Sequence, residues 1–224
     1  MPADPGTRPL GRVLLTGATG MVGSAVLSAL LENESVFEII SLGRRRTGCK
    51  HPKLTETVVT EFGDAEALQP CCTGVDTVFH CLATYSARVS RDAYEQITVD
   101  WLNAILKACT VSAPGATFCL FSAQGARPDG GGMSFALKIK GKAETHLFSS
   151  GVKRKFAFRP GYIAPSGPMN GWKPSDYLFR PVQRLLPSIG ITSDELAQAM
   201  LKTASADRRS SAVLENGEMR TLFG

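Results

Sequence analysis

Three glycines at positions 17, 20 and 23 stand out in the segment GATGMVG, near the N-terminal end of the chain. An apolar run over residues 12–15 precedes them, and apolar residues recur at helical spacing over residues 21–33. In this order of strand, turn and helix, Gly17 permits a tight turn, Gly20 lets the backbone approach a pyrophosphate, and Gly23 lets the helix pack closely on the strand. The free N–H groups at the helix start favour an anion. The pattern predicts a dinucleotide-binding turn, and the alternative is an ordinary glycine-rich turn.

The basic segment after the second expected strand indicates which dinucleotide would bind. A site for NAD usually places a carboxylate about 20 residues past the glycines, where it accepts hydrogen bonds from the ribose hydroxyls. This chain has Gly43, Arg44 and Arg45 there instead. Guanidinium groups pair with a 2′-phosphate and have no comparable partner on a bare ribose. The sequence therefore predicts NADP(H) as the cofactor, and the alternative is a solvated basic loop or a localisation signal.

Apolar, strand-forming runs alternate with helical patterns along most of the chain. We expect strands over residues 12–15, 37–42, 57–62, 75–82, 117–121 and 155–158, and helices over residues 21–33, 92–109, 135–149 and 193–206, the last with Ser193 as its N-cap. This alternation implies right-handed βαβ units. The predicted fold class is α/β, a Rossmann-type doubly wound, mostly parallel sheet with helices on both faces.

The length and composition fit a single NAD(P)-binding domain over residues 1–224. With 43% hydrophobic and 20% charged residues, the chain resembles ordinary globular proteins, and we expect disorder only at its ends, over residues 1–10 in particular. Residues 160–224 begin with a proline- and glycine-rich stretch and are expected to supply the substrate side. The first residues lack the apolar core of a secretory signal, and no apolar run is long enough to span a bilayer, which predicts a cytoplasmic protein.

The formal net charge of +5 comes partly from basic runs at residues 44–46, 153–155 and 208–209. Such runs can meet nucleic acid, an anionic cofactor or only water. No aromatic residues interleave with them, so we expect no nucleic-acid partner. The six cysteines show no metal-ligand spacing, and Cys81, Cys109 and Cys119 lie in apolar surroundings. We therefore expect reduced thiols in the core and no metal site.

Several short motifs follow one another in the order GATGMVG, LGRRR, FGD, HCLAT, SAQGA, KGKAE and FRPG. Together they resemble the atypical short-chain dehydrogenase/reductase superfamily over about residues 11–206, among NAD(P)-binding epimerase-like proteins and nearest to the Tat-interacting oxidoreductase-like branch. The resemblance implies NADP(H) contacts from the adenine, at Asp64, to the nicotinamide, near Ile163. The implied contact residues are Gly17, Thr19, Gly20, Met21, Val22, Arg44, Arg45, Asp64, Leu82, Ala83, Thr84, Lys140 and Ile163.

The resemblance also implies catalytic residues, and here the chain departs from the family pattern. The family uses a serine and a YxxxK pair, in which the tyrosine transfers a proton while the lysine lowers the tyrosine pKa and binds the nicotinamide ribose. Ser122 matches the serine and Lys140 the lysine, but Ala136 stands at the tyrosine position. An alanine cannot transfer a proton.

Other side chains offer acid–base groups away from that motif. Tyr85 and Tyr162 each follow an expected strand, but neither they nor Tyr94 restores the one-turn spacing to the lysine. His80 and His146 have no visible partner in the sequence and are interpreted as structural residues.

The sequence thus predicts an NADP(H)-binding protein with oxidoreductase or epimerase-like chemistry on an unknown small-molecule carbonyl substrate. The missing tyrosine leaves one alternative, a noncatalytic NADP(H)-binding sensor or protein-interaction module, which would have a protein partner. Neither nucleic acid nor a membrane is expected as a partner, and the oligomeric state stays open.

Overall fold

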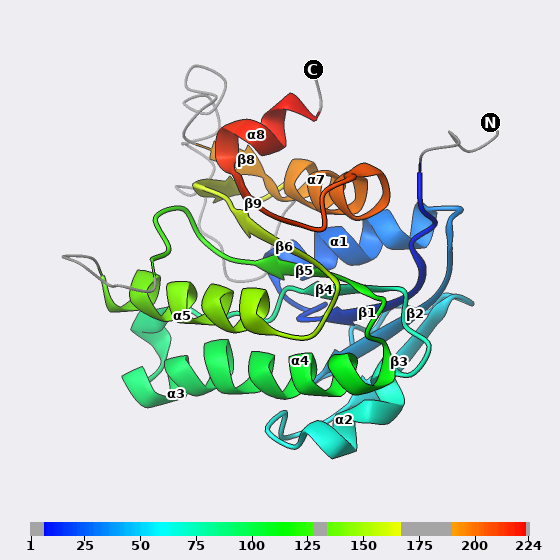
Figure 1. Cartoon of the computed structure of the whole chain (residues 1–224), viewed down its shortest axis with the longest axis horizontal. Coiled ribbons are helices and arrows are strands. Elements are labelled where there is room, and N and C mark those ends of the chain that lie inside the picture. The colour runs from blue at the N-terminus through cyan, green and yellow to red at the C-terminus, as the bar shows by residue number, and fades with distance from the viewer. Residues whose placement is uncertain (1–6, 128–133, 167–189, 223–224) are drawn as a thin grey trace.

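The computed structural model describes residues 7–127, 134–166 and 190–222. Within them, seven strands form one sheet in the order β3-β2-β1-β4-β5-β6-β9 (Figure 1). All neighbouring strands are parallel. The strands are β1 (Gly11–Thr16), β2 (Val36–Gly43), β3 (Leu54–Val58), β4 (Thr77–His80), β5 (Thr117–Phe121), β6 (Arg154–Arg159) and β9 (Ser211–Glu215). The strand order reverses between β1 and β4, and doubly wound sheets bind ligands beyond the carboxyl ends of their strands at such a point.

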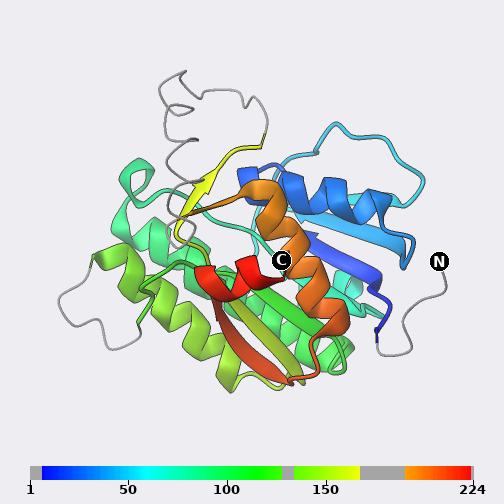
Figure 2. The same ribbon diagram turned by 90° about the horizontal axis from the view of Figure 1, so that it is seen from above.

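Helices cover both faces of this sheet, as Figure 1 shows. On one face α1 (Met21–Glu32) and α7 (Ser193–Ala206) pack against each other, and Figure 2 shows them side by side. The other face carries α2 (Ala65–Cys72), α3 (Arg91–Glu95), α4 (Trp101–Ser112) and α5 (Phe135–Ser149), with a π-helical turn, Gln96–Asp100, between α3 and α4. The predicted Rossmann-type fold class is confirmed.

Two apolar cores, one on each face of the sheet, explain why the strands are apolar throughout. Leu14 of β1 lies in the core under α4, whereas its neighbours Val13 and Leu15 lie in the core under α1. A parallel strand covered on both faces needs apolar side chains in both directions. The cysteines follow the same logic, because Cys81, Cys109 and Cys119 are all buried, as expected, and all carry free thiols.

The smaller elements lie at the carboxyl end of the chain. Strands β7 (Tyr162–Ala164) and β8 (Gly190–Thr192) form a two-stranded parallel sheet. Helix α8 (Asn216–Thr221) packs on α7. None of the helices in the described parts of the chain combines the length and the apolar character needed to cross a bilayer.

The structure agrees with the expected bounds of β5, α5 and α7 and corrects those of the third strand. That strand covers Leu54–Val58 and not residues 57–62. Phe62 is instead completely buried and stacks on Trp101, with the ring centroids 5.0 Å apart. Phe62 is apolar because it packs in the core under α4. A sequence pattern cannot distinguish such a residue from an apolar residue of a strand.

Two further expectations, the helix over residues 92–109 and the N-cap of the helix over residues 193–206, differ from the structure. The helix expected over residues 92–109 is divided into α3, the π-helical turn and α4. The N-cap of α7 is Thr192, not Ser193, because the Thr192 hydroxyl accepts a hydrogen bond from the Glu195 backbone N–H at 3.1 Å and Glu195 in turn accepts from the Thr192 N–H at 2.8 Å. Helix α2, strands β7, β8 and β9, and helix α8 were not predicted.

The N-terminal residues that the structure describes are attached to the fold, although disorder was expected over residues 1–10. The Arg8 N–H donates to the Ser205 carbonyl at 2.9 Å. Leu10 is buried in the core under α1. Residues 128–133 of the glycine-rich loop before α5, and residues 167–189 of the expected substrate-side segment, lie outside the described residues.

Candidate cofactor-binding and active site

The glycine turn between β1 and α1 has the close contacts that its sequence predicts. Gly17 has a φ of +75°, and a Cβ placed there would lie 2.5 Å from the Cys81 carbonyl oxygen. A Cβ at Gly23 would lie 2.1 Å from the Gly17 carbonyl oxygen, so only glycine lets α1 pack this close to the turn. Gly20 is the N-cap of α1 and has no side-chain cap, which leaves the first N–H groups of a 12-residue helix facing the end of the sheet.

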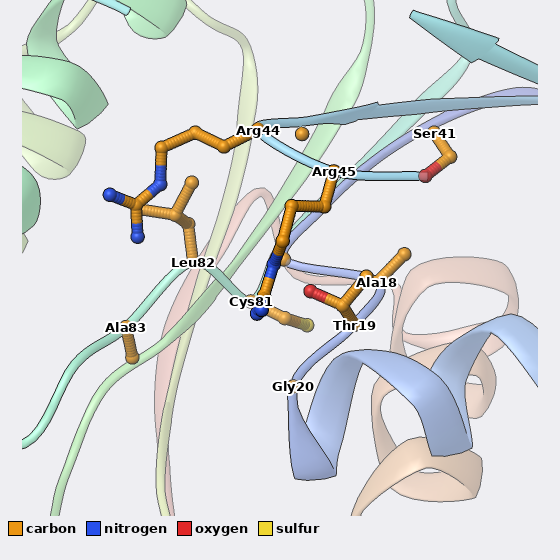
Figure 3. Close-up of a pocket in the computed structure, with 11 residues that line it drawn as sticks. Ala18, Thr19, Gly20, Ser41, Arg44, Arg45, Cys81, Leu82 and Ala83 are labelled. Carbon is orange, nitrogen blue, oxygen red and sulfur yellow. The ribbon is translucent and has the colours of Figure 1, made fainter. Parts of the chain in front are cut away.

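A cavity opens where this turn meets the carboxyl ends of β2 and β4 (Figure 3). We call it the arginine cavity. It is lined by Gly17, Ala18, Thr19, Gly20, Ser41, Gly43, Arg44, Arg45, Cys81, Leu82 and Ala83. Arg44 and Arg45 both enter it from the loop after β2, as Figure 3 shows. The structure therefore brings the predicted anion-binding turn and the two predicted arginines to one place.

The three consecutive arginines have different partners. Arg46 lies 3.8 Å from a Glu56 carboxylate oxygen, and the same carboxylate accepts hydrogen bonds from the Thr47 N–H and hydroxyl, which lower the Glu56 pKa. Among the described residues, no carboxylate pairs with Arg44 or Arg45. Two unneutralised guanidinium groups that line a cavity attract anions to it.

A second cavity, of about 460 Å³, continues from the arginine cavity past the end of β5. We call it the apolar cavity. It is lined by Gly20, Met21, Val22, Cys81, Ala83, Thr84, Tyr85, Phe121, Ser122, Ala123, Lys140, Gly161, Tyr162 and Ile163. Gly20, Cys81 and Ala83 line both cavities. An elongated ligand can therefore extend from the arginines to Lys140, and this volume is in the range of small-molecule sites.

Lys140 reaches the apolar cavity from α5 with little access to water. Its side chain is buried, and its Nζ donates a hydrogen bond to the Phe121 carbonyl oxygen at 3.0 Å. Burial lowers the pKa of Lys140 to about 8, and the nearby Glu144 carboxylate opposes that shift. The ammonium thus keeps unused donor positions beside the cavity and can release a proton near neutral pH.

Ser122 is buried at the end of β5, and its hydroxyl is already engaged. It donates to Glu144 Oε1 at 2.5 Å. The Glu144 carboxylate also receives two hydrogen bonds from Arg159, from Nε to Oε1 at 2.9 Å and from Nη2 to Oε2 at 2.5 Å. Because the only proton of Ser122 points to a carboxylate held by an arginine, this hydroxyl cannot donate to a substrate without breaking that contact.

Among the other predicted site residues, Asp64 lines neither cavity. Its carboxylate accepts hydrogen bonds from the Glu66 and Ala67 N–H groups and caps α2. The remaining predicted contacts line one or both cavities, as the two sets of lining residues show.

The additional acid–base candidates separate into two groups. Tyr85 and Tyr162 line the apolar cavity, whereas Tyr94 is buried in the core under α4. His80 contacts the Thr16 hydroxyl through Nδ1 at 3.0 Å, and burial lowers its pKa to about 3, so it is a neutral structural residue. His146 lies on a separate surface groove between α4 and α5.

Several residues that surround the site were not predicted from the sequence. Ser41, Cys81 and Phe121 line the cavities from the carboxyl ends of β2, β4 and β5, which the strand pattern itself could have indicated. Glu144 and Arg159 were present in the motifs KGKAE and FRPG, and the one-turn spacing from Lys140 to Glu144 was a usable signal. In the described parts of the chain, no three His, Cys, Asp or Glu side chains are grouped so that they could hold a metal ion.

The sheet order, the glycine turn and the cavities at the strand ends define a dinucleotide-binding protein of the Rossmann type. Residues 13–136 match the NAD dependent epimerase/dehydratase family, and the chain belongs to that family. It is therefore an oxidoreductase- or epimerase-like NAD(P)-binding protein, as the resemblance in its motifs predicted.

The sequence identity to individual proteins is modest. It is 29% identical over 178 residues to "Protein fmp52, mitochondrial" of Aspergillus fumigatus, covering 76% of this chain and 74% of that protein. It is 25% identical over 155 residues to Protein HTATIP2 of Rattus norvegicus, covering 67% of this chain and 62% of that protein. A short chain dehydrogenase from Burkholderia cenocepacia, solved in complex with NADP, has a TM-score of 0.71 at 13% identity and covers 97% of this chain and 93% of its own. That last likeness shows the fold and not the cofactor.

Proposed function

We propose that this NAD(P)-binding protein prefers NADP(H) and reduces or epimerises a small carbonyl substrate. The observation that supports the preference is the pair Arg44 and Arg45, which line the arginine cavity with no carboxylate partner among the described residues. A carboxylate at this place would repel a 2′-phosphate, and guanidinium groups attract it.

The residues around the two cavities fit the parts of NADP(H) in order. The glycine turn and the start of α1 would hold the pyrophosphate through Gly17, Thr19 and Gly20, with Arg44 and Arg45 at the 2′-phosphate. The residues proposed to follow toward the nicotinamide are Met21, Val22, Leu82, Ala83, Thr84, Lys140 and Ile163. Asp64 would reach the adenine only from beyond the cavity, at the start of α2.

The bound cofactor supplies a hydride, and the chain must manage the proton. Ala136 has no proton to give, and the hydroxyl of Ser122 is held by Glu144. The ammonium of Lys140 borders the apolar cavity, and its pKa is lowered to about 8, so it is the proton donor that we propose. In this proposal Ser122 positions Glu144 and the end of β5 and does not transfer the proton itself.

The alternative of a noncatalytic sensor or interaction module is not favoured, because the matching family is one of epimerases and dehydratases. A cytoplasmic location and a protein partner both stay predictions. The name of the fmp52 relative contains the word mitochondrial, which is a reason to test the location directly with a tagged full-length chain.

Calorimetric titration with NADPH and NADH, together with NADPH oxidation at 340 nm over a panel of ketones and aldehydes, tests this proposal. Tighter binding of NADPH and measurable oxidation with at least one carbonyl compound are expected. Equal affinities for the two cofactors would contradict the proposed preference. Binding without any oxidation across the panel would instead contradict the proposed reduction.

A further inference from the structure

Trp101, the first residue of α4, lies next to one of the two cavity arginines. Its side chain is 4% exposed and stacks on Phe62 at a centroid distance of 5.0 Å and an interplanar angle of 26°. The guanidinium carbon of Arg44 lies over the same indole, 5.5 Å from the ring centroid. A cation at this distance over an indole is attracted by the ring, and indole is the strongest of the aromatic partners.

Stacking on Phe62 does not by itself require a tryptophan at this position. Among the described residues, the buried Trp101 Nε1 has no hydrogen-bond partner. An unsatisfied buried N–H disfavours folding, and a phenylalanine would stack on Phe62 without that penalty. The feature that a phenylalanine would supply less well is the attraction for the Arg44 guanidinium.

The contact also concerns the freedom of Arg44. Arg44 is exposed, and an arginine on a surface loop loses considerable rotamer entropy when a ligand orders it. A side chain that already rests on an aromatic ring has lost part of that freedom before the ligand arrives. Figure 3 shows the Arg44 and Arg45 side chains extending from the loop after β2, and both line the arginine cavity.

We propose that Trp101 is a positioning residue for cofactor selection, which holds the guanidinium of Arg44 ready for the 2′-phosphate of NADP(H). This inference rests on the proposed function, since it assumes that Arg44 meets that phosphate. Trp101 does not touch the reacting atoms. Its effect acts through Arg44 alone, and NADH binding does not depend on it.

A double-mutant cycle of Trp101→Leu and Arg44→Ala, with NADPH and NADH affinities measured by calorimetry, tests this proposal. Trp101→Leu is expected to weaken NADPH binding about 2- to 5-fold, the size of a cation–π contact, and to leave NADH binding unchanged. In the Arg44→Ala background, Trp101→Leu should cause no further loss of NADPH affinity. Ile105→Val, which alters the same helix in the same core, is the matched control and should leave the ratio of the two affinities unchanged.

The outcomes separate this inference from the proposed function. If Arg44→Ala leaves NADPH binding unchanged, the proposed role of Arg44 is wrong and this inference falls with it. If Arg44→Ala weakens NADPH binding selectively but Trp101→Leu weakens both cofactors equally, or acts in full in the Arg44→Ala background, only the role of Trp101 is wrong. Should Trp101→Leu not fold, Trp101→Phe keeps a ring on Phe62 and is expected to show a loss of about 2-fold, restricted to NADPH and absent without Arg44.

Discussion

Replacing Arg44 and Arg45 by alanine should remove most of the preference for NADP(H). A hydrogen bond to a charged group contributes about 1.5–3 kcal/mol. Both side chains are exposed, so we use the lower end, about 1.5 kcal/mol for each arginine, which corresponds to about 10-fold in affinity for one and 100-fold for both. NADH carries no 2′-phosphate, and its affinity should change by less than about 2-fold.

Arg46→Ala is the matched control for this prediction. Arg46 belongs to the same basic run, but its guanidinium lies 3.8 Å from Glu56 and it does not line the cavity. Arg46→Ala lowers the charge of the loop by the same amount as Arg44→Ala or Arg45→Ala. A difference between these variants therefore reports the position of the arginine and not the loss of charge. Calorimetry at low ionic strength suits the comparison, because salt screens exposed charges. The reasoning is refuted if Arg46→Ala weakens NADPH binding as much as Arg44→Ala or Arg45→Ala, or if the double variant loses NADPH and NADH affinity equally.

The other predictions concern catalysis and the glycine turn. Ala136→Tyr should raise the kcat for NADPH-dependent reduction by about 10-fold or more, since it places a phenol one helical turn before Lys140, and no gain in steady-state assays would show that Lys140 cannot support such a donor. The kcat of the unaltered chain should be highest below pH 8 and fall as the pH rises through about 8, because a proton donor must be protonated and the pKa of Lys140 is lowered to about 8. Lys140→Met should abolish this pH dependence of kcat and most of kcat itself. If the Lys140→Met variant keeps the same pH profile, another group donates the proton. Gly23→Ala should lower the free energy of unfolding by about 2 kcal/mol or more and weaken binding of both cofactors, since its Cβ would lie 2.1 Å from the Gly17 carbonyl oxygen. Gly115→Ala, where a Cβ meets nothing within 4 Å, is the control in chemical denaturation, and equal effects of the two changes would contradict the packing argument.

Local sequence patterns were sufficient for the parts of the site that depend on neighbouring residues. The turn between β1 and α1 is formed by residues within one short segment, and the contacts at Gly17 and Gly23 agree with the roles that their spacing predicts. Strand β5 also ends at the residue that the sequence pattern predicts, and this places Phe121 and Ser122 at the apolar cavity. Features that depend only on residues close together in the sequence can be predicted without the tertiary structure.

Contacts between distant segments could not be predicted in the same way. The run of three arginines gives no sign that Arg46 pairs with Glu56 while Arg44 rests on Trp101, 57 positions further along the chain. The engagement of Ser122 likewise depends on Glu144 and Arg159, which come from α5 and β6. The tertiary structure determines which side chains contact each other. A sequence motif therefore identifies a candidate residue but not its hydrogen-bond and ion-pair partners.

A crystal structure of the unaltered chain with NADP⁺ tests the central claim most directly. The account predicts the pyrophosphate over the start of α1 and the 2′-phosphate oxygens within about 3 Å of guanidinium nitrogens of Arg44 and Arg45. A 2′-phosphate that points into solvent, with both arginines turned away from it, would contradict the account.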